Sequence, residues 1–345
     1  MTEFSLEPST STGDPQFSVI VPTLNVARTL GRCLTSLIEA KEASLEIILV
    51  DDASSDETIA LAQSFPVRLI RAENNLGPAG ARNLGAQQAR GEILVFVDAD
   101  ITVEADVFAR LKAFFRQHPH AAAVSGVYST NCPAQGFFAR YKNYYLVHSY
   151  SWMSGRIGAL NTSLAAVKKA VFLQIGGFDP QWREGEDTIL GSELTLTGHA
   201  VYLDPDLQMR HLKEYTFVEL IKDDFVKAYY MAKYLLGKTS RLPTLLFNRQ
   251  GHHHSATQMI KVPAAYLLLI SAFFLLLRPY GLTITAFVPA LFFFSMLNAS
   301  LWIFIRRNES RVFAISAIML HFIEMLVAGG AIIVAFLALV FRSRP

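Results

Sequence analysis

Two aspartates separated by one residue, Asp98 and Asp100, end the apolar segment EILVFVDAD (residues 92–100). Carboxylates at the end of a strand can hold Mg²⁺ or Mn²⁺, which take oxygen ligands and usually share their coordination with substrate phosphates. Such an ion neutralises the charge that grows on a leaving nucleotide. Because Asp-x-Asp is common by chance, this interpretation depends on the residues that accompany the pair.

Two further segments carry groups that suit a nucleotide. Asp52 ends another apolar run, where its carboxylate can accept hydrogen bonds from a base or a ribose. Gly77 opens a helical pattern that contains Arg82. Backbone N–H groups at a helix N-terminus, together with a guanidinium, favour the binding of a diphosphate. The order of these groups predicts a nucleotide-diphosphate site.

The elements that must position these groups are short β-branched runs, which alternate with segments of 3.6-residue periodicity. The runs cover residues 17–22, 46–52, 67–70 and 92–100. Their alternation predicts an α/β domain with a parallel sheet and helices on both faces. Ligands of such sheets bind at the carboxyl ends of the strands, which is where the polar groups lie. Ser54 and Glu57 have the spacing of a capping box, which predicts the start of the second helix.

Four runs occur in a fixed order along the chain: SVIVPTLN, VDDASSDET, NNLGPAGARNLGA and GEILVFVDAD. As a set they resemble the motifs of the family 2 glycosyltransferases, which have the GT-A fold, a Rossmann-like nucleotide-diphospho-sugar transferase domain. The resemblance covers roughly residues 17–211, more than half of the chain. It implies the inverting transfer of one sugar from a nucleotide diphosphate, with Mg²⁺ or Mn²⁺ as cofactor.

The resemblance also implies roles for individual residues. It assigns the nucleotide-sugar pocket to Pro22, Thr23, Asn25, Asp52, Gly77, Arg82 and Asp98, and the metal ion to Asp98, Asp100 and His211. Thr23 departs from the aromatic residue that the family often has there, so the resemblance does not carry base stacking to this position. A structural role remains the alternative for His211.

The segment GGFDP (176–180) and the following Glu186 and Asp187 match the acceptor-site segment of the same family. Inversion requires in-line attack by the acceptor oxygen, and a hydroxyl needs a carboxylate within hydrogen-bond reach to take its proton. The resemblance implies that Asp187 is this base and that Glu186 positions it or binds the acceptor. The pair also suits the first turn of a helix, and the two interpretations are compatible.

The C-terminal part is strongly apolar. Uncharged runs cover residues 262–277 and 279–305, and a third run over 312–341 is interrupted only by His321 and Glu324. The second and third can cross a hydrocarbon core of about 30 Å, whereas the first is borderline. His321 and Glu324 share one helical face, and polar groups inside a membrane are often functional. No partner is visible for them in the sequence, so we leave them outside the predicted site.

Charge and amphipathicity suggest how the chain meets a membrane. Residues 210–261 carry nine Lys or Arg against four Asp or Glu, and residues 215–236 form a basic amphipathic pattern typical of an interfacial helix. The aromatic stretch 137–153 is expected to face the membrane as a lip, with an ordinary core segment as the alternative. The arginines between the last two spans favour a cytoplasmic loop, which places the catalytic domain in the cytoplasm; Arg342 and Arg344 argue mildly against this topology.

We therefore expect four regions in a multi-pass protein of the inner cell membrane. They are a disordered tail (1–16), a GT-A catalytic domain (17–213), an amphipathic interfacial helix with a linker (214–261) and about three transmembrane helices (262–345). The net charge of +2 does not argue for nucleic acid as a partner.

The expected reaction moves a sugar from a UDP- or GDP-linked donor to a hydroxyl of a membrane lipid or lipid-linked acceptor. A polyprenyl phosphate is the alternative acceptor, and it needs no strong base because it is already anionic. A processive polysaccharide synthase is disfavoured because Gln208 to His211 does not match the Gln-x-x-Arg-Trp motif of such enzymes. A non-catalytic scaffold or binding subunit and a transporter are further alternatives.

Overall fold

The computed structural model describes residues 3–4, 14–40, 45–237, 253–277 and 281–342. The chain divides into two compact units. We call Met1–Gln135 with Tyr150–Glu214 the sheet unit, and Gly136–Ser149 with Tyr215–Pro345 the helix unit.

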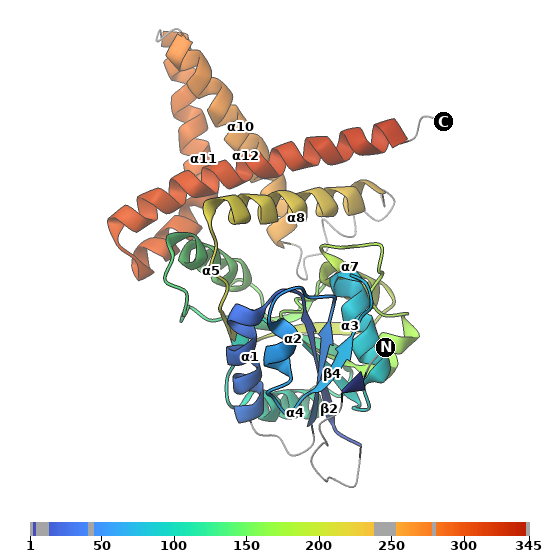
Figure 1. The fold of residues 1–345 in the computed structure, drawn as a ribbon. Helices are drawn as coiled ribbons and strands as arrows, with labels where there is room; N and C mark the ends of the chain where they lie inside the picture. The colour runs from blue at the N-terminus through green and yellow to red at the C-terminus, as the bar shows by residue number, and fades with distance from the viewer. Residues whose placement is uncertain (1–2, 5–13, 41–44, 238–252, 278–280, 343–345) are drawn as a thin grey trace. The chain divides into compact units, whose positions relative to one another are not determined.

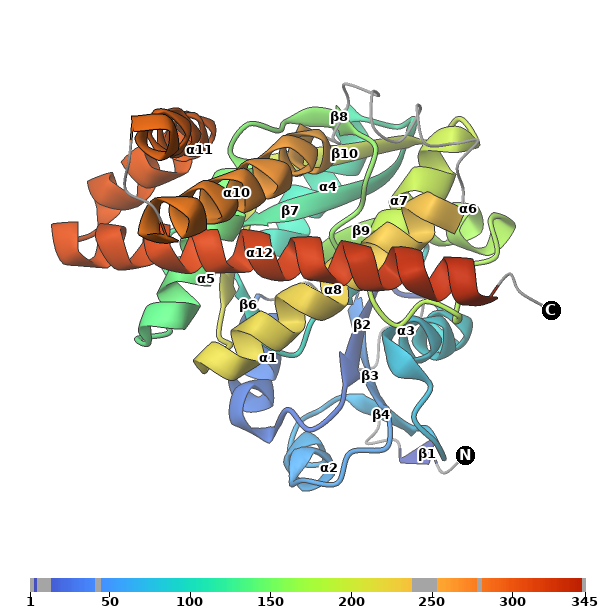
Figure 2. The same cartoon turned by 90° about the horizontal axis from the view of Figure 1, so that it is seen from above.

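The sheet unit is built on one ten-stranded sheet (Figures 1 and 2). Its strands lie in the order β1-β4-β3-β2-β5-β9-β7-β10-β6, and β8 pairs with β10. The strands are β1 (Glu3–Phe4), β2 (Phe17–Thr23), β3 (Leu45–Asp51), β4 (Arg68–Arg71), β5 (Ile93–Val97), β6 (Ile101–Val103), β7 (Ala121–Tyr128), β8 (Gly155–Ile157), β9 (Leu164–Lys168) and β10 (Ala200–His211).

The predicted parallel sheet is confirmed for the four strands from which it was predicted. Strands β4, β3, β2 and β5 are mutually parallel, so the ends of the four predicted strands meet at one edge. In the other half, β9 runs antiparallel to both β5 and β7, and β6 runs antiparallel to β10. A strand that is buried on both faces is apolar throughout. Its sequence therefore has no pattern that distinguishes parallel from antiparallel pairing.

Six helices lie among the described residues of the sheet unit. They are α1 (Ala27–Glu39), α2 (Thr58–Ala62), α3 (Gly77–Gln88), α4 (Val107–Gln117), α6 (Lys169–Gln174) and α7 (Glu186–Leu196). The predicted capping box is wrong: α2 begins at Thr58, whose N–H donates to the carboxylate of Asp56. The hydroxyl of Ser54 instead accepts the backbone N–H of Asn25, from the neighbouring strand end.

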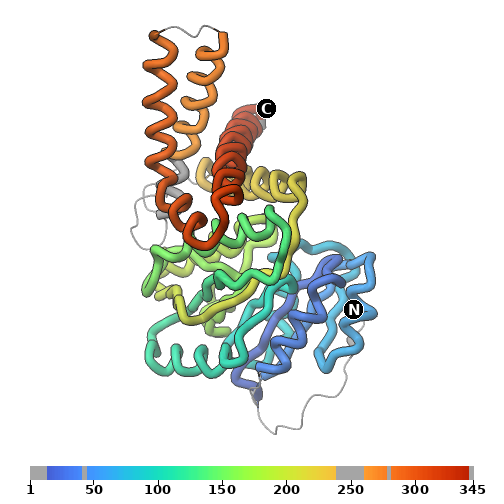
Figure 3. The backbone as a smooth tube through the Cα atoms, turned by 90° about the vertical axis from the view of Figure 1, so that its left-hand side faces the viewer, coloured from blue at the N-terminus to red at the C-terminus, as the bar shows by residue number. Residues whose placement is uncertain are grey.

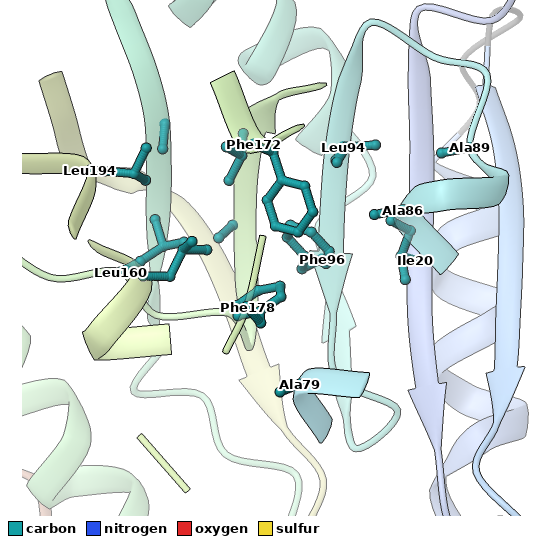
Figure 4. Packing of buried hydrophobic residues seen from close by; sticks show 14 of the residues in the cluster. Ile20, Ala79, Ala86, Ala89, Leu94, Phe96, Leu160, Phe172, Phe178 and Leu194 are labelled. Carbon is teal, nitrogen blue, oxygen red and sulfur yellow. The ribbon is translucent and has the colours of Figure 1, made fainter. Parts of the chain in front are cut away.

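Three phenylalanine side chains pack against one another in the core of the sheet unit, beside β5. Phe96 of β5 meets Phe178 edge to face at 5.1 Å between ring centroids, and Phe172 of α6 completes the group (Figure 4). Such ring pairs stabilise beyond the area that they bury. They hold the GGFDP segment, which contains Phe178, against β5.

Gly191 lets α7 approach the backbone of a neighbouring loop. A Cβ at this position would lie 2.2 Å from the amide nitrogen of Leu160, which is closer than atoms can approach. We expect Gly191→Ala to destabilise the protein by about 1–3 kcal/mol, the usual effect of overpacking. The melting temperature of the full chain tests this. Gly31→Ala is the control, because its nearest neighbour would be 3.8 Å away; equal melting temperatures of the two variants would contradict the prediction.

The described residues of the helix unit form α5 (Phe137–Tyr150), α8 (Phe217–Gly237), α10 (His253–Leu277), α11 (Gly281–Asn308) and α12 (Arg311–Arg342). Figure 3 shows α10 and α11, in orange, running side by side. The segments Ile260–Leu277, Gly281–Asn308 and Arg311–Phe341 are long and apolar enough to cross a membrane. This confirms three candidate spans, including the borderline first one, because α10 begins well before residue 262.

Taken together, the predicted tail, aromatic stretch, amphipathic helix and linker correspond only in part to described residues. Glu3 and Phe4 of the predicted tail pair with β4, and residues 5–13 lie outside the described residues. The aromatic stretch forms α5, and the amphipathic pattern forms α8. The predicted linker residues 238–252 also lie outside the described residues. Placement of α5 and α8 at a membrane surface stays a prediction.

Candidate active site

The ends of β2 and β3 are tied together by Asn25. Its side-chain oxygen accepts the backbone N–H groups of Ser55 at 2.8 Å and Asp56 at 3.3 Å. Asn25 and Ala53 both have left-handed backbone conformations, with φ of 53° and 66°. Non-glycine residues in this region carry strain that clusters at functional sites. The two loops therefore form a fixed rim at the carboxyl edge of the sheet.

Pro22 and Thr23 end strand β2 beside this rim. Pro22 is half-buried, whereas Thr23 is buried and donates its hydroxyl to the carbonyl oxygen of Val50 in the neighbouring strand. Of the two, Pro22 has the more accessible surface for a ligand.

Asp52 shapes the start of α3. One carboxylate oxygen accepts the N–H of Leu76 at 2.5 Å and the other accepts the N–H of Gly77 at 2.9 Å. Burial raises the pKa of Asp52 above its usual range, although these two N–H groups oppose the shift. The carboxylate predicted to meet a base or ribose is thus already bonded to the two residues at the start of α3.

Asp98 lies at a junction of polar side chains. One oxygen accepts a hydrogen bond from Arg82 at 2.7 Å, and the other accepts the hydroxyl of Ser163 at 2.8 Å. Ser163 in turn accepts the hydroxyl of Tyr128 at 2.8 Å. Ser163 and Tyr128 were missed by sequence reasoning, because neither lies in a motif that marks a donor to Asp98.

Asp100 and His211 come together although they are far apart in sequence. The Nε2 atom of His211 lies 3.7 Å from a carboxylate oxygen of Asp100, and the N–H of Leu212 donates to the Asp100 carbonyl at 2.7 Å. A carboxylate and an imidazole suit Mn²⁺, and a carboxylate suits Mg²⁺. No group of three or more His, Cys, Asp and Glu side chains that could hold a metal ion occurs among the described residues. The metal set therefore stays a prediction.

Arg82 joins the strand end to the N-terminus of α7. Its guanidinium donates to Glu186 at 2.5 Å and to Asp98 at 2.7 Å, and it is only 5% exposed. Sequence reasoning placed Arg82 near a nucleotide diphosphate but did not predict either ion pair. Burial raises the pKa of Glu186 to about 7, with Arg82 acting against the shift and Asp187 adding to it.

Asp187 lies next to this ion-pair network. Its carboxylate accepts the N–H of Thr188 at 2.6 Å and that of Thr162 at 3.4 Å. Burial raises its pKa above the usual range, and Arg82 is the largest opposing influence. A carboxylate with a raised pKa is a better proton acceptor near neutral pH than an ordinary aspartate.

Arg183 is a further residue that the motifs did not indicate. It donates to the side-chain oxygen of Asn75 at 2.8 Å and is exposed. A Cβ at Gly77 would lie 3.7 Å from its guanidinium, so Arg183 stands over the first residue of α3. It adds positive charge at the helix N-terminus, where anions bind.

The comparisons with known proteins relate part of this chain to glycosyltransferases. Residues 18–173 match the model of glycosyl transferase family 2. A PGL/p-HBAD biosynthesis glycosyltransferase of Mycobacterium bovis is 39% identical over 118 residues, which cover 32% of this chain and 46% of the relative. The succinoglycan biosynthesis protein ExoO of Rhizobium meliloti is 38% identical over 100 residues, 28% of this chain and 29% of that protein. The chain thus spans about half the length, or less, of these curated relatives.

One solved structure covers most of both chains. The mannosyltransferase PcManGT from Pyrobaculum calidifontis, in complex with GDP-Man and Mn²⁺, aligns over 86% of this chain and 88% of its own, with a TM-score of 0.55 and 21% identity. At this identity the likeness concerns the fold. Residues 18–173 therefore resemble the family 2 glycosyltransferases, the fold resembles that of GT-A enzymes, and three C-terminal helices are long and apolar enough to cross a membrane.

Proposed function

We propose that the protein transfers a sugar, with inversion, from a UDP- or GDP-linked donor to a hydroxyl of a membrane lipid or lipid-linked acceptor. The observation that carries this proposal is the buried guanidinium of Arg82, which holds Asp98 of the donor edge and Glu186 of the acceptor segment together. Asp187 follows Glu186 directly and has the raised pKa of a proton acceptor.

The donor is proposed to lie at the rim formed by the ends of β2 and β3 and by the N-terminus of α3. Pro22 and Asn25 offer surface for the base and ribose, while Gly77 and Arg183 face the diphosphate. Asp100 and His211 would hold a divalent cation, with Asp98 beside them. When bound, the cation neutralises charge on the departing nucleotide diphosphate.

The acceptor hydroxyl is proposed to lose its proton to Asp187. The N–H groups of Thr162 and Thr188 fix the orientation of this carboxylate before the acceptor arrives. Glu186 is held by Arg82, so it is suited to positioning rather than to taking the proton. Such preorganisation limits the rearrangement that the reaction requires.

A lipid acceptor is supported by the three candidate spans and by the names of relatives that act in PGL/p-HBAD and succinoglycan biosynthesis. The arginines at 306, 307 and 311, between the last two spans, support a cytoplasmic catalytic unit at the inner membrane. A polyprenyl phosphate is the second candidate acceptor. Asp187 favours a hydroxyl instead, because an anionic phosphate needs no base.

The function is tested by offering the protein, reconstituted in lipid, a panel of UDP- and GDP-sugars with Mg²⁺ or Mn²⁺ and identifying glycolipids by mass spectrometry. A product linked through a lipid hydroxyl supports the proposal. A product linked only through a phosphate supports the polyprenyl-phosphate alternative. Absence of sugar transfer with every donor, combined with intact nucleotide binding, would support a non-catalytic binding subunit.

Removal of divalent cations should abolish transfer, and addition of Mn²⁺ or Mg²⁺ should restore it. Asp100→Ala should lower kcat/KM by about 100-fold or more, because a catalytic ion contributes several kcal/mol to the transition state. Both effects are measured as initial rates of transfer. Asp106→Ala is the control, since Asp106 lies at the surface and pairs with Arg110. Full activity in EDTA would refute the metal assignment.

A further inference from the structure

A continuous row of polar side chains runs through the interior of the helix unit. We call it the polar chain; its members, in order of contact, are Lys142, Asp224, Glu324, Tyr141, His321 and Asn298. They come from four helices, α5, α8, α11 and α12. His321 is fully buried and Glu324 is 4% exposed, so water does not satisfy these groups. Every link of the polar chain must therefore contain a proton of its own.

The proton at the Asn298 end can be located. The side-chain amide of Asn298 donates to the carbonyl oxygen of Phe294 at 2.9 Å, one turn earlier in α11. Its oxygen faces Nε2 of His321 at 3.0 Å and can only accept. Nε2 of His321 therefore carries a hydrogen.

Tyr141 lies between two acceptors but has one hydroxyl proton. Its oxygen lies 2.9 Å from Nδ1 of His321 and also contacts Oε2 of Glu324. If the hydroxyl donates to Glu324, Nδ1 of His321 must carry a second hydrogen; if it donates to His321, Glu324 must be protonated. Either arrangement places one proton more in this triangle than a neutral histidine and a carboxylate would hold.

The same reasoning applies to the two acidic side chains. The carboxyl group of Glu324 lies beside that of Asp224 and raises its pKa. Oε1 of Glu324 and Oδ2 of Asp224 are buried, and no donor reaches either atom within the described part of the chain. Two neighbouring ionised carboxylates repel each other, and a proton held between their unsatisfied oxygens removes this repulsion. This link therefore holds a second proton, while Lys142 neutralises charge at the other oxygen of Asp224.

We propose that the polar chain is a proton-binding site that holds two protons beyond the ordinary ionisation states, and that their release to water loosens α8 from α12. Without these protons, two buried carboxylates would face each other and Tyr141 would lack a donor on one side, which is costly in a buried site. Burial raises the pKa of Asp224 to about 7, with Lys142 opposing the shift and Glu324 adding to it.

The surrounding charged and titratable groups are few. On α5 they are Lys142, Tyr145 and His148, on α10 Lys261, on α8 Asp224, and on α12 His321 and Glu324. The cations Lys142 and Lys261 favour ionised carboxyls, so they set the pH at which protons leave rather than supplying the missing donors.

The sign of the pH dependence follows from Asp224. Its folded-state pKa, about 7, exceeds the ordinary value, so between about pH 4 and 7 the folded state holds a proton that the unfolded state has lost. Stability from this proton is complete at low pH and is lost as the pH rises towards 7. The unfolding constant should grow by up to about tenfold per pH unit in this window.

The test is infrared spectroscopy of the full-length protein in lipid, combined with thermal melting between pH 5 and 8. At pH 6 the wild type should show the C=O stretch of a protonated carboxyl that Glu324→Gln lacks. The glutamine amide can donate to Asp224 and accept from Tyr141, so this variant should fold, and its melting temperature should depend less on pH than that of the wild type.

Asp223→Asn is the matched control, because Asp223 precedes Asp224 on α8 but pairs with Lys227 instead. This control should keep both the band and the pH dependence. If Glu324→Gln fails to fold, Asp224→Asn replaces it, with its amide donating to Glu324. Identical carboxyl bands in the wild type and the folded variants would overturn the proposal. Neither readout depends on sugar transfer, so the result is independent of the proposed function.

Discussion

Replacement of Asp187 by asparagine should lower kcat for sugar transfer by about 10²- to 10⁴-fold, the usual contribution of a positioned general base. Asparagine can keep the hydrogen bonds from the N–H groups of Thr162 and Thr188 through its oxygen, but it cannot take a proton. The shape of the site should therefore survive while its chemistry is lost. Steady-state rates with a lipid acceptor and titration calorimetry with the nucleotide measure these two properties separately.

Glu193→Gln is a suitable control because it removes a carboxylate from the same helix, two turns further along α7. It should leave the rate within a factor of a few of the wild type. Near-normal transfer by Asp187→Asn would exclude Asp187 as the base. It would favour a phosphate acceptor, which attacks without losing a proton.

The pH dependence of kcat/KM also tests the role of Asp187. Asp187 must be ionised to act as a base, so activity should fall as the pH drops through its pKa. Burial raises that pKa, which places the acidic limb of kcat/KM above the roughly 3.9 of an ordinary aspartate. In Asp187→Asn the residual activity should lack this limb.

The motifs near the strand ends were predictable because each is local. The segments around Asn25, Asp52 and Asp98 each combine an apolar strand with the polar residues that follow it, and parallel strands bring such ends to one edge. The partners of those residues were not predictable. Arg82 reaches Glu186 across 104 residues of chain, and strand β9, which brings Ser163 to Asp98, enters the sheet antiparallel.

In the helix unit, too, the local spacing of residues was predictable, whereas their long-range partner was not. The spacing of His321 and Glu324 predicted that they share one face of a helix, and the two side chains lie 3.4 Å apart. Their common partner, Tyr141, lies about 180 residues away in a stretch that suggested a membrane-facing surface. Periodicity shows which face of a helix is polar, but the residue that meets that face depends on tertiary packing.

Arg82→Met should produce the second large effect, because it removes the only cation that bridges Asp98 and Glu186 in the described structure. Breaking a buried ion pair on one side typically costs about 3–5 kcal/mol, since the remaining charge is left without compensation. We expect a marked loss of melting temperature and a loss of transfer. Arg82→Lys should recover part of the stability, because a single ammonium cannot reproduce the two-pronged geometry of a guanidinium.

A purely structural role for Arg82 would lower the amount of folded enzyme and leave its pH profile unchanged. A positioning role makes a different prediction, because Arg82 opposes the rise in pKa of both Glu186 and Asp187. Without the guanidinium, both carboxyls should hold their protons to higher pH. The acidic limb of kcat/KM should therefore move upward in folded Arg82→Met, and by less in Arg82→Lys, whose ammonium keeps the positive charge. An unmoved limb would show that Arg82 supports the fold without tuning the base.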